Sequence, residues 1–78
     1  MVNELDSVAL THDIEEYGLK QGDVGVVVHR YKDGSASEVE FVTAEGKTIA
    51  VLTLSWKDIR PLGGREILHV RELARPVL

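Results

Sequence analysis

The stretch GLKQGDVGVVVHRYKDGSASEVEFV, residues 18–42, decides the fold of this chain. Its first half contains VGVVVHRY, residues 24–31, which is rich in β-branched side chains and predicts a strand. Asp33 and Gly34 then form a dipeptide that is typical of a hairpin turn. After it, SEVEFV, residues 37–42, alternates charged and apolar side chains. The whole stretch therefore predicts a β-hairpin.

The second strand of this hairpin has an apolar side and a charged side. Val39 and Phe41 fall on one face, and Glu38 and Glu40 on the other, as in a strand with one face in water. Solvated carboxylates are not expected to have a perturbed acidity, so this pair is not predicted to act in acid–base catalysis. Their face remains a candidate for contact with a partner.

Three glycines mark the start of the hairpin. A phosphate-binding loop would need a Gly-Lys-Ser/Thr sequence or a glycine-rich turn that opens a helix, and here the segment opens a strand. We therefore interpret Gly18 and Gly22 as turn residues. Gly25 is interpreted as a point where two segments of the chain approach closely.

The flanking sequence supplies the other strands. ELDSVAL, residues 4–10, predicts a first strand before a long loop, and KTIAVLTL, residues 47–54, predicts a fourth. Ser55 and Asp58 are spaced for capping a single helical turn, which would precede a short last strand. Closing so small a sheet would remove its exposed edges. The predicted fold class is all-β, a small five-stranded SH3-like barrel over residues 1–61.

The tail, residues 62–78, differs from the body. Gly63 and Gly64 form a candidate hinge, and apolar residues then recur at spacings of three and four: Ile67, Val70, Leu73, Ala74 and Val77. This period predicts a short amphipathic helix over residues 65–75, with a strand through residues 66–70 as the alternative. About 11 residues make a marginal helix in isolation, so we expect the tail to dock on the barrel or on a partner.

Composition and charge narrow the functional classes. The 78 residues include no cysteine, so neither a disulfide nor thiol chemistry is available. Residues 1–59 carry eleven acidic and five basic side chains, whereas residues 60–78 carry two acidic and four basic ones. An acidic body disfavours a surface for phosphate backbones, and a basic tail suits an acidic surface or is simply solvated. With no signal-peptide pattern and no apolar run near the ~20 residues of a membrane span, we expect a cytoplasmic protein.

Side chains that could carry chemistry are sparse. His12 and the carboxylates that follow it could form a loose cation site, but a solvated acidic loop explains them better. His29 lies among valines in a predicted strand, where a hydrogen-bonded structural role is the simpler interpretation. The serines lack a histidine and a carboxylate at the local spacing of a nucleophilic triad. We expect no catalytic residue, metal or cofactor, and a protein that is not an enzyme.

The only tryptophan, Trp56, lies in the polar context SWKD after the fourth strand. It could cap the open end of the barrel, which is the more common role. The alternative is an interface anchor, because tryptophan is enriched where protein partners bind tightly.

Four motifs give the chain a resemblance to a known family: Leu-Asp-x-Val at residues 5–8, Gly-Asp-Val-Gly at 22–25, Glu-Val-Glu-Phe at 38–41 and Asp-Ile-Arg-Pro at 58–61. The chain resembles short bacterial proteins grouped as a domain of unknown function (DUF4926). The resemblance implies an SH3-like barrel and a second small protein as partner, as in a toxin–antitoxin pair. GDVGVVV also loosely resembles the KOW segment of translation and transcription factors, which implies RNA or ribosome binding as the alternative function.

The sequence thus predicts a non-enzymatic module that binds another protein or itself through its tail. Nucleic acid, membranes and small-molecule substrates are not expected as partners. The candidate partner-binding residues come from the tail, from Trp56 and from the charged face of the hairpin: Trp56, Ile67, Val70, Arg71, Leu73, Ala74, Glu38 and Glu40.

Overall fold

The computed structural model of the protein describes residues 2–73. Its elements are five β-strands and one turn of 3-10 helix: β1 (Ser7–Leu10), η1 (Glu15–Tyr17), β2 (Val24–Arg30), β3 (Ala36–Val42), β4 (Thr48–Ser55) and β5 (Ile59–Pro61). Each predicted strand is confirmed, although β1 begins three residues later than expected. Leu5 has a left-handed backbone (φ 72°), which interrupts an extended run before Ser7. The described residues include no helix that is long and apolar enough to cross a membrane.

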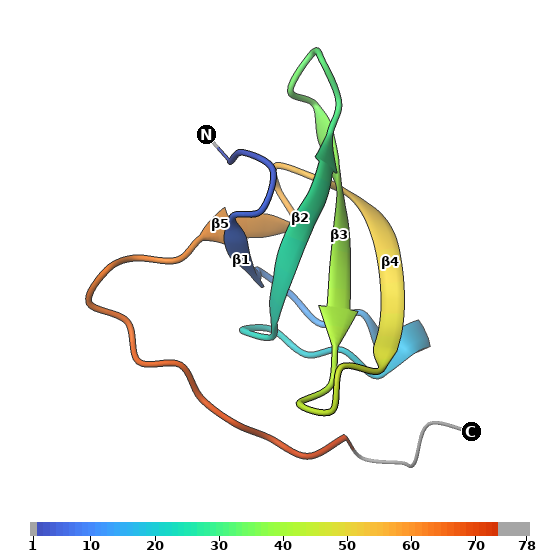
Figure 1. The fold of residues 1–78 in the computed structure, drawn as a ribbon, viewed down its shortest axis with the longest axis vertical. Helices are drawn as coiled ribbons and strands as arrows, with labels where there is room; N and C mark the ends of the chain where they lie inside the picture. The colour runs from blue at the N-terminus through green and yellow to red at the C-terminus, as the bar shows by residue number, and fades with distance from the viewer. Residues whose placement is uncertain (1, 74–78) are drawn as a thin grey trace.

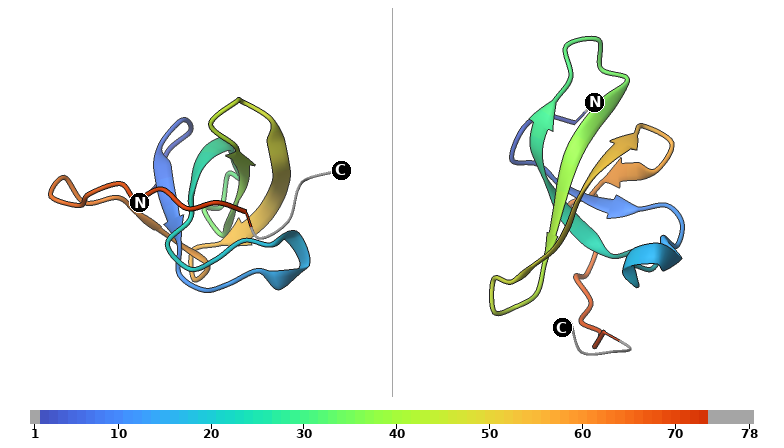
Figure 2. Two further views of the ribbon diagram at one scale, coloured as in Figure 1. Left: turned by 90° about the horizontal axis from the view of Figure 1, so that it is seen from below. Right: turned by 90° about the vertical axis from the view of Figure 1, so that its right-hand side faces the viewer.

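The strands form one antiparallel sheet in the order β4-β3-β2-β1-β5. Figures 1 and 2 show the sheet strongly curled, with the 3-10 turn and the long loop at one end. The β2–β3 hairpin pairs Val27 with Val39, and a bulge between Val27 and His29 shifts the register beyond it. The hairpin predicted from the sequence is therefore the centre of the sheet.

The core lies on the concave side of the curled sheet. Its fully buried side chains come from three strands and the long loop: Val8, Leu10, Leu19, Val27, Val39 and Phe41. The predicted alternation of β3 is confirmed, because Val39 and Phe41 are buried while Glu38 and Glu40 lie on the opposite face.

Gly25 is the point of close approach that the sequence indicated. A Cβ atom at this position would lie 2.7 Å from Cγ1 of Val39, 2.8 Å from Cε1 of Phe41 and 3.0 Å from the carbonyl oxygen of Glu40. Cβ atoms in proteins essentially never lie closer than 3.0 Å to such atoms, so the contacts with Val39 and Phe41 would be clashes. The core therefore packs directly on the backbone of β2.

The predicted closed barrel is not formed. β4 and β5 remain the two edges of the sheet, and no ladder joins them in the described part of the chain. β5 has only three residues and ends at Pro61, which has no N–H to donate to a further ladder. The edges thus stay open, although the sheet curls around its core.

The predicted C-terminal helix is also wrong, as is the alternative strand. Residues 65–73, the described part of the predicted helix, contain neither helix nor strand. An amphipathic helix of this length needs its apolar face packed, yet Ile67 is 89% exposed and Val70 is 90% exposed. Without that packing, a helix with this 3.6-residue apolar period is not stable.

Candidate functional site

The described part of the tail, residues 62–73, leaves β5 at the sheet edge and runs in an extended path beneath the molecule (Figure 1). Two ion pairs attach it to the body. Near its start, Arg60 pairs with Glu66 at 2.8 Å, and the Gly63 amide also donates to Glu66. These donors lower the pKa of Glu66 to about 2, with the Arg60 hydrogen bond as the main cause.

The second attachment is made by Arg71. Its Nε donates to Oδ1 of Asp23 at 2.8 Å, and Nη2 donates both to Oδ2 of Asp23 and to the Gly18 carbonyl at 2.9 Å. Burial opposes ionisation of Asp23, but Arg71 and the Lys20 amide outweigh it and hold the pKa of Asp23 below its ordinary value. We call the Asp23 carboxylate with the Gly18 carbonyl the arginine site. A two-pronged pair of this kind fixes direction as well as distance.

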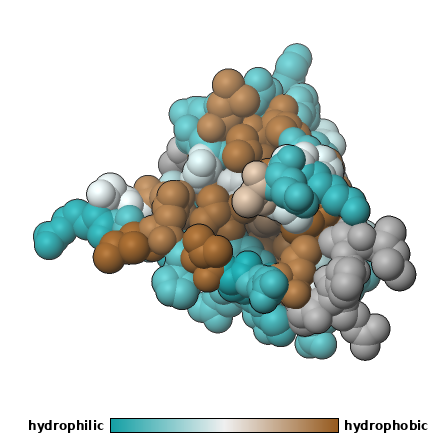
Figure 3. Space-filling view, turned by 60° about the horizontal axis from the view of Figure 1, so that its bottom comes forward, coloured by the Kyte–Doolittle hydropathy of each residue, from teal (hydrophilic) through white to brown (hydrophobic). Residues whose placement is uncertain are grey.

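The arginine site lies on the rim of a groove of about 900 Å³ at the end of the sheet. The tail forms one wall of the groove through residues 69–73, and the loop between β3 and β4 forms another. The large apolar side chains that the body contributes to its lining are Leu19, Val24, Phe41, Val42 and Ile49. The tail adds Val70 and Leu73. Figure 3 turns this end forward and shows apolar surface reaching the outside among hydrophilic residues.

Trp56 lies in the turn between β4 and β5. It is 70% exposed, and the ammonium of Lys57 lies 5.7 Å from its ring centroid. Together with Ile59 and Pro61 it borders a smaller cavity of about 280 Å³. Most of the indole is therefore available for contact, in keeping with the interface interpretation.

The charged face of the hairpin is organised by hydrogen bonds. Tyr31 donates its hydroxyl to Glu38 at 2.7 Å, Thr53 donates to the same carboxylate, and Thr48 donates to Glu40 at 2.7 Å. The donors on Thr53 and Tyr31 lower the pKa of Glu38, and its carboxylate in turn raises the pKa of Tyr31. Both carboxylates are thus held in place by hydrogen bonds, and the expectation of an unperturbed acidity is wrong for Glu38.

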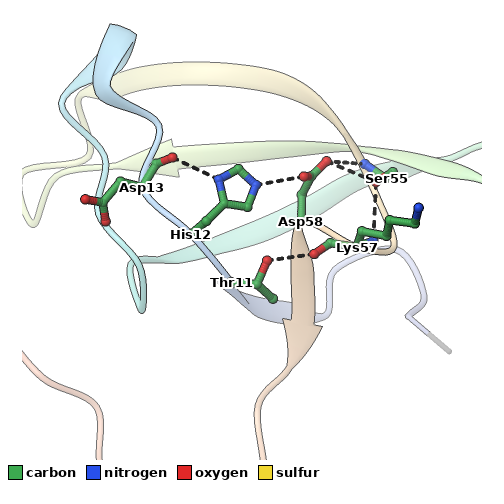
Figure 4. A network of polar contacts seen from close by, with 6 residues as sticks. All are labelled: Thr11, His12, Asp13, Ser55, Lys57 and Asp58. Carbon is green, nitrogen blue, oxygen red and sulfur yellow. Dashed lines mark hydrogen bonds and ion pairs between the residues drawn. The ribbon is translucent and has the colours of Figure 1, made fainter.

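A polar network joins the long loop to the turn before β5 (Figure 4). Nε2 of His12 contacts Oδ1 of Asp58 at 2.8 Å, and Oδ2 of Asp58 accepts from the amide and hydroxyl of Ser55 at 2.9 and 3.1 Å. The carboxylate lies between the other two groups, whereas a nucleophilic triad needs the imidazole between serine and carboxylate. The network therefore holds the long loop against the turn before β5. Ser55 and Asp58 are hydrogen-bonded as predicted, but residues 56–58 form a turn and not the predicted helical turn.

The histidines differ in surroundings. The hydrogen bond to Asp58 and a second one to the Asp13 carbonyl raise the pKa of His12. His29 is half-exposed and packs edge-on against Tyr31 at 4.9 Å between ring centroids. Among residues 2–73, no group of three or more side chains is arranged to hold a metal ion.

The structure separates the predicted partner-binding residues into three surfaces. Ile67, Val70, Arg71 and Leu73 share the tail, Trp56 lies at the turn before β5, and Glu38 and Glu40 lie on the outer face of β3. Ala74 lies outside the described residues. Sequence reasoning missed Asp23 as the partner of Arg71. The one relevant signal in the sequence was the charge asymmetry between body and tail. It indicates that a basic residue of the tail contacts an acidic residue of the body, but it does not indicate which ones.

Comparison with known proteins places the chain in a family. The family model described as "Domain of unknown function (DUF4926)" matches residues 4–61, which extend from the turn before β1 to the end of β5. Searches of curated proteins and of solved structures found no match. Because the matched region covers most of the chain, this protein belongs to the DUF4926 family.

Proposed function

We propose that this protein is a non-enzymatic, SH3-like interaction module that binds another protein, or a second copy of itself, through its tail. The SH3-like assignment is supported by the five-stranded order, the long loop after β1 and the tight turn before β5. The partner that the family resemblance implies is a second small protein, as in a toxin–antitoxin pair.

The observation that carries the proposal is the exposure of the aliphatic side chains on the tail. Ile67, Leu68 and Val70 stand in solvent on a segment that is held against the body at both ends, by Arg60 and by Arg71. Removing aliphatic surface from water contributes about 25 cal/mol per Å², from which the entropic costs of association are subtracted. A positioned segment also loses less conformational entropy on binding than a free one.

The outer face of the hairpin supports a protein partner over a nucleic acid. The carboxylates of Glu38 and Glu40 are held there by hydrogen bonds, and two acidic side chains on this face disfavour contact with a phosphate backbone. The same carboxylates suit basic side chains of a protein that contacts both the sheet and the tail.

The test replaces the exposed aliphatic residues in the full-length chain. We expect Ile67→Ser/Val70→Ser to lose self-association in sedimentation velocity, or to lose a protein that wild type retains from extracts of its native host. The matched control is Arg65→Ser/Glu72→Ser, which alters two exposed polar side chains of the same segment. If the aliphatic variant assembles and retains partners as wild type does, the tail is not the binding surface.

A further inference from the structure

The arginine site is organised by the body. The Lys20 amide donates to Oδ2 of Asp23 at 2.8 Å, and the Asp23 amide donates back to the Lys20 carbonyl at 2.9 Å. Gly18 has a left-handed backbone (φ 71°) that any larger residue would adopt only with strain. The loop of residues 18–23 thus presents a carboxylate and a carbonyl in a geometry that matches a guanidinium.

The tail contacts this site mainly through one side chain. In the described part of the tail, the backbone hydrogen bond is local, from the Glu66 amide to the Gly63 carbonyl, and Arg71 supplies the contacts to the loop. Val70, next to Arg71, lines the groove yet keeps 90% of its surface exposed. Leu73 also lines the groove and is half-buried, so the tail fills the charged part of the groove and covers only some of its apolar part.

We propose that the groove is a peptide-binding site for an extended, arginine-bearing segment of a partner protein, and that Arg71 of the tail occupies its arginine site in the absence of that partner. The partner's guanidinium takes the place of Arg71 on Asp23 and Gly18. Aliphatic side chains beside the partner's arginine pack on the exposed or half-buried part of the apolar lining, which is formed by Val24, Val42 and Ile49.

Charge complementarity favours this class of partner. Asp13 adds to the field that acts on Arg71. Of the body's charged side chains in the groove, Asp23 and Glu45 are acidic and Lys47 is basic, so the acidic charge prevails and favours cationic segments. An extended chain also needs no change of fold to enter, because the tail is already extended there. The two-pronged hydrogen bonding of the guanidinium would orient the bound segment, and the apolar lining would bury its aliphatic side chains.

Apart from Val70, which lines the groove, this inference uses a different surface from the exposed aliphatic residues of the tail, and it does not depend on the proposed function. It adds a competition: a partner segment must displace Arg71. Short flexible linkers give an effective concentration in the millimolar range, so the attached tail weakens binding of a free peptide without abolishing it.

The experiment is a nuclear magnetic resonance titration of full-length ¹⁵N-labelled protein. The probe is a blocked peptide with the sequence of residues 65–73, REILHVREL, and the control peptide carries Arg71→Ala. We expect saturable shifts of the Gly18, Leu19 and Lys20 amide signals in the Arg71→Ala protein. In wild type the same peptide should bind at least about tenfold more weakly, because the tail competes.

Two further variants test whether peptide binding requires the carboxylate of Asp23. Asp23→Asn/Arg71→Ala should lose the saturable shifts, and Asp23→Glu/Arg71→Ala tests the same carboxylate should the asparagine disturb the loop. The dispersion of the amide spectrum reports directly whether each variant is folded.

The proposal is overturned if the peptide binds the Arg71→Ala protein no more tightly than wild type, or if the control peptide binds equally well. It is also overturned if wild type sediments as a dimer that Arg71→Ala dissociates, because the site then belongs to a second copy's tail. A loss of partner binding by Ile67→Ser/Val70→Ser with unchanged peptide titration would leave the groove intact, so the two proposals fail separately.

Discussion

Replacing Gly25 with alanine tests whether the core packs directly on the backbone of β2. The added methyl group would lie 2.7 Å from Val39 and 2.8 Å from Phe41, both fully or nearly fully buried, and 3.0 Å from the Glu40 carbonyl. β3 is paired on both sides, so its backbone cannot move away without breaking a ladder. Relief must therefore come from strained rotamers or from separation of the two strands.

The magnitude follows from two opposing effects. Overpacking of a close-packed core costs about 1–3 kcal/mol. Removing a glycine from the unfolded chain returns about 0.4–1 kcal/mol. We therefore expect Gly25→Ala to lower the free energy of unfolding by about 1–2 kcal/mol, and Tm by roughly 5–15 °C for a chain of this size.

The assay is urea denaturation with thermal melting followed by circular dichroism. Gly64→Ala is the matched control, because its added methyl group would meet nothing within 4 Å. A double variant, Gly25→Ala/Val39→Ala, should be less destabilised than the sum of its single variants, because it removes one clashing atom. Stability of Gly25→Ala equal to or above wild type would refute the close contact.

Three other predictions concern polar and aromatic contacts. Because the pKa of His12 is raised in the folded state, the stability contributed by its pair with Asp58 should be fully present below the unfolded pKa of about 6.5 and lost as pH rises through the folded value. Urea midpoints of wild type and His12→Gln, compared between about pH 5 and 8.5, would show this loss. A carbon-detected titration should give Glu66 a pKa of about 2 that returns toward the ordinary range in Arg60→Ala; an unchanged value would disprove the ion pair. Trp56→Ala should cost at most about 2 kcal/mol, because only the buried minority of its surface is lost, and a larger loss in calorimetry would assign it to the core.

Much of the sheet could be predicted from local pattern. The alternation through Val39 and Phe41 places one face in the core, and β-branched residues with an Asp33-Gly34 turn specify the hairpin. Gly25 was interpretable as a close approach because a glycine inside a strand is otherwise unfavourable. These features are determined by residues close together in the sequence, so they can be predicted from it.

The tail shows where local pattern was insufficient. Ile67 and Val70 have helical spacing, but a helix of this length forms only if a surface covers its apolar side. In the same way, closure of the barrel depended on whether a three-residue strand ending in Pro61 could pair with β4. Both outcomes depend on distant parts of the chain.

The sequence alone determined a small all-β chain with an acidic body, a basic tail and a central hairpin, because periodicity, turn chemistry and charge are properties of the chain itself. Only the tertiary structure decided that Arg71 meets Asp23, 48 residues away, and that the sheet stays open. The folding of the loop that carries Gly18 and Asp23 brings a carboxylate and a carbonyl together as one guanidinium site. Spacing along the chain does not predict this arrangement. The tertiary structure therefore gives the charge asymmetry a defined position, which is the candidate site for a partner.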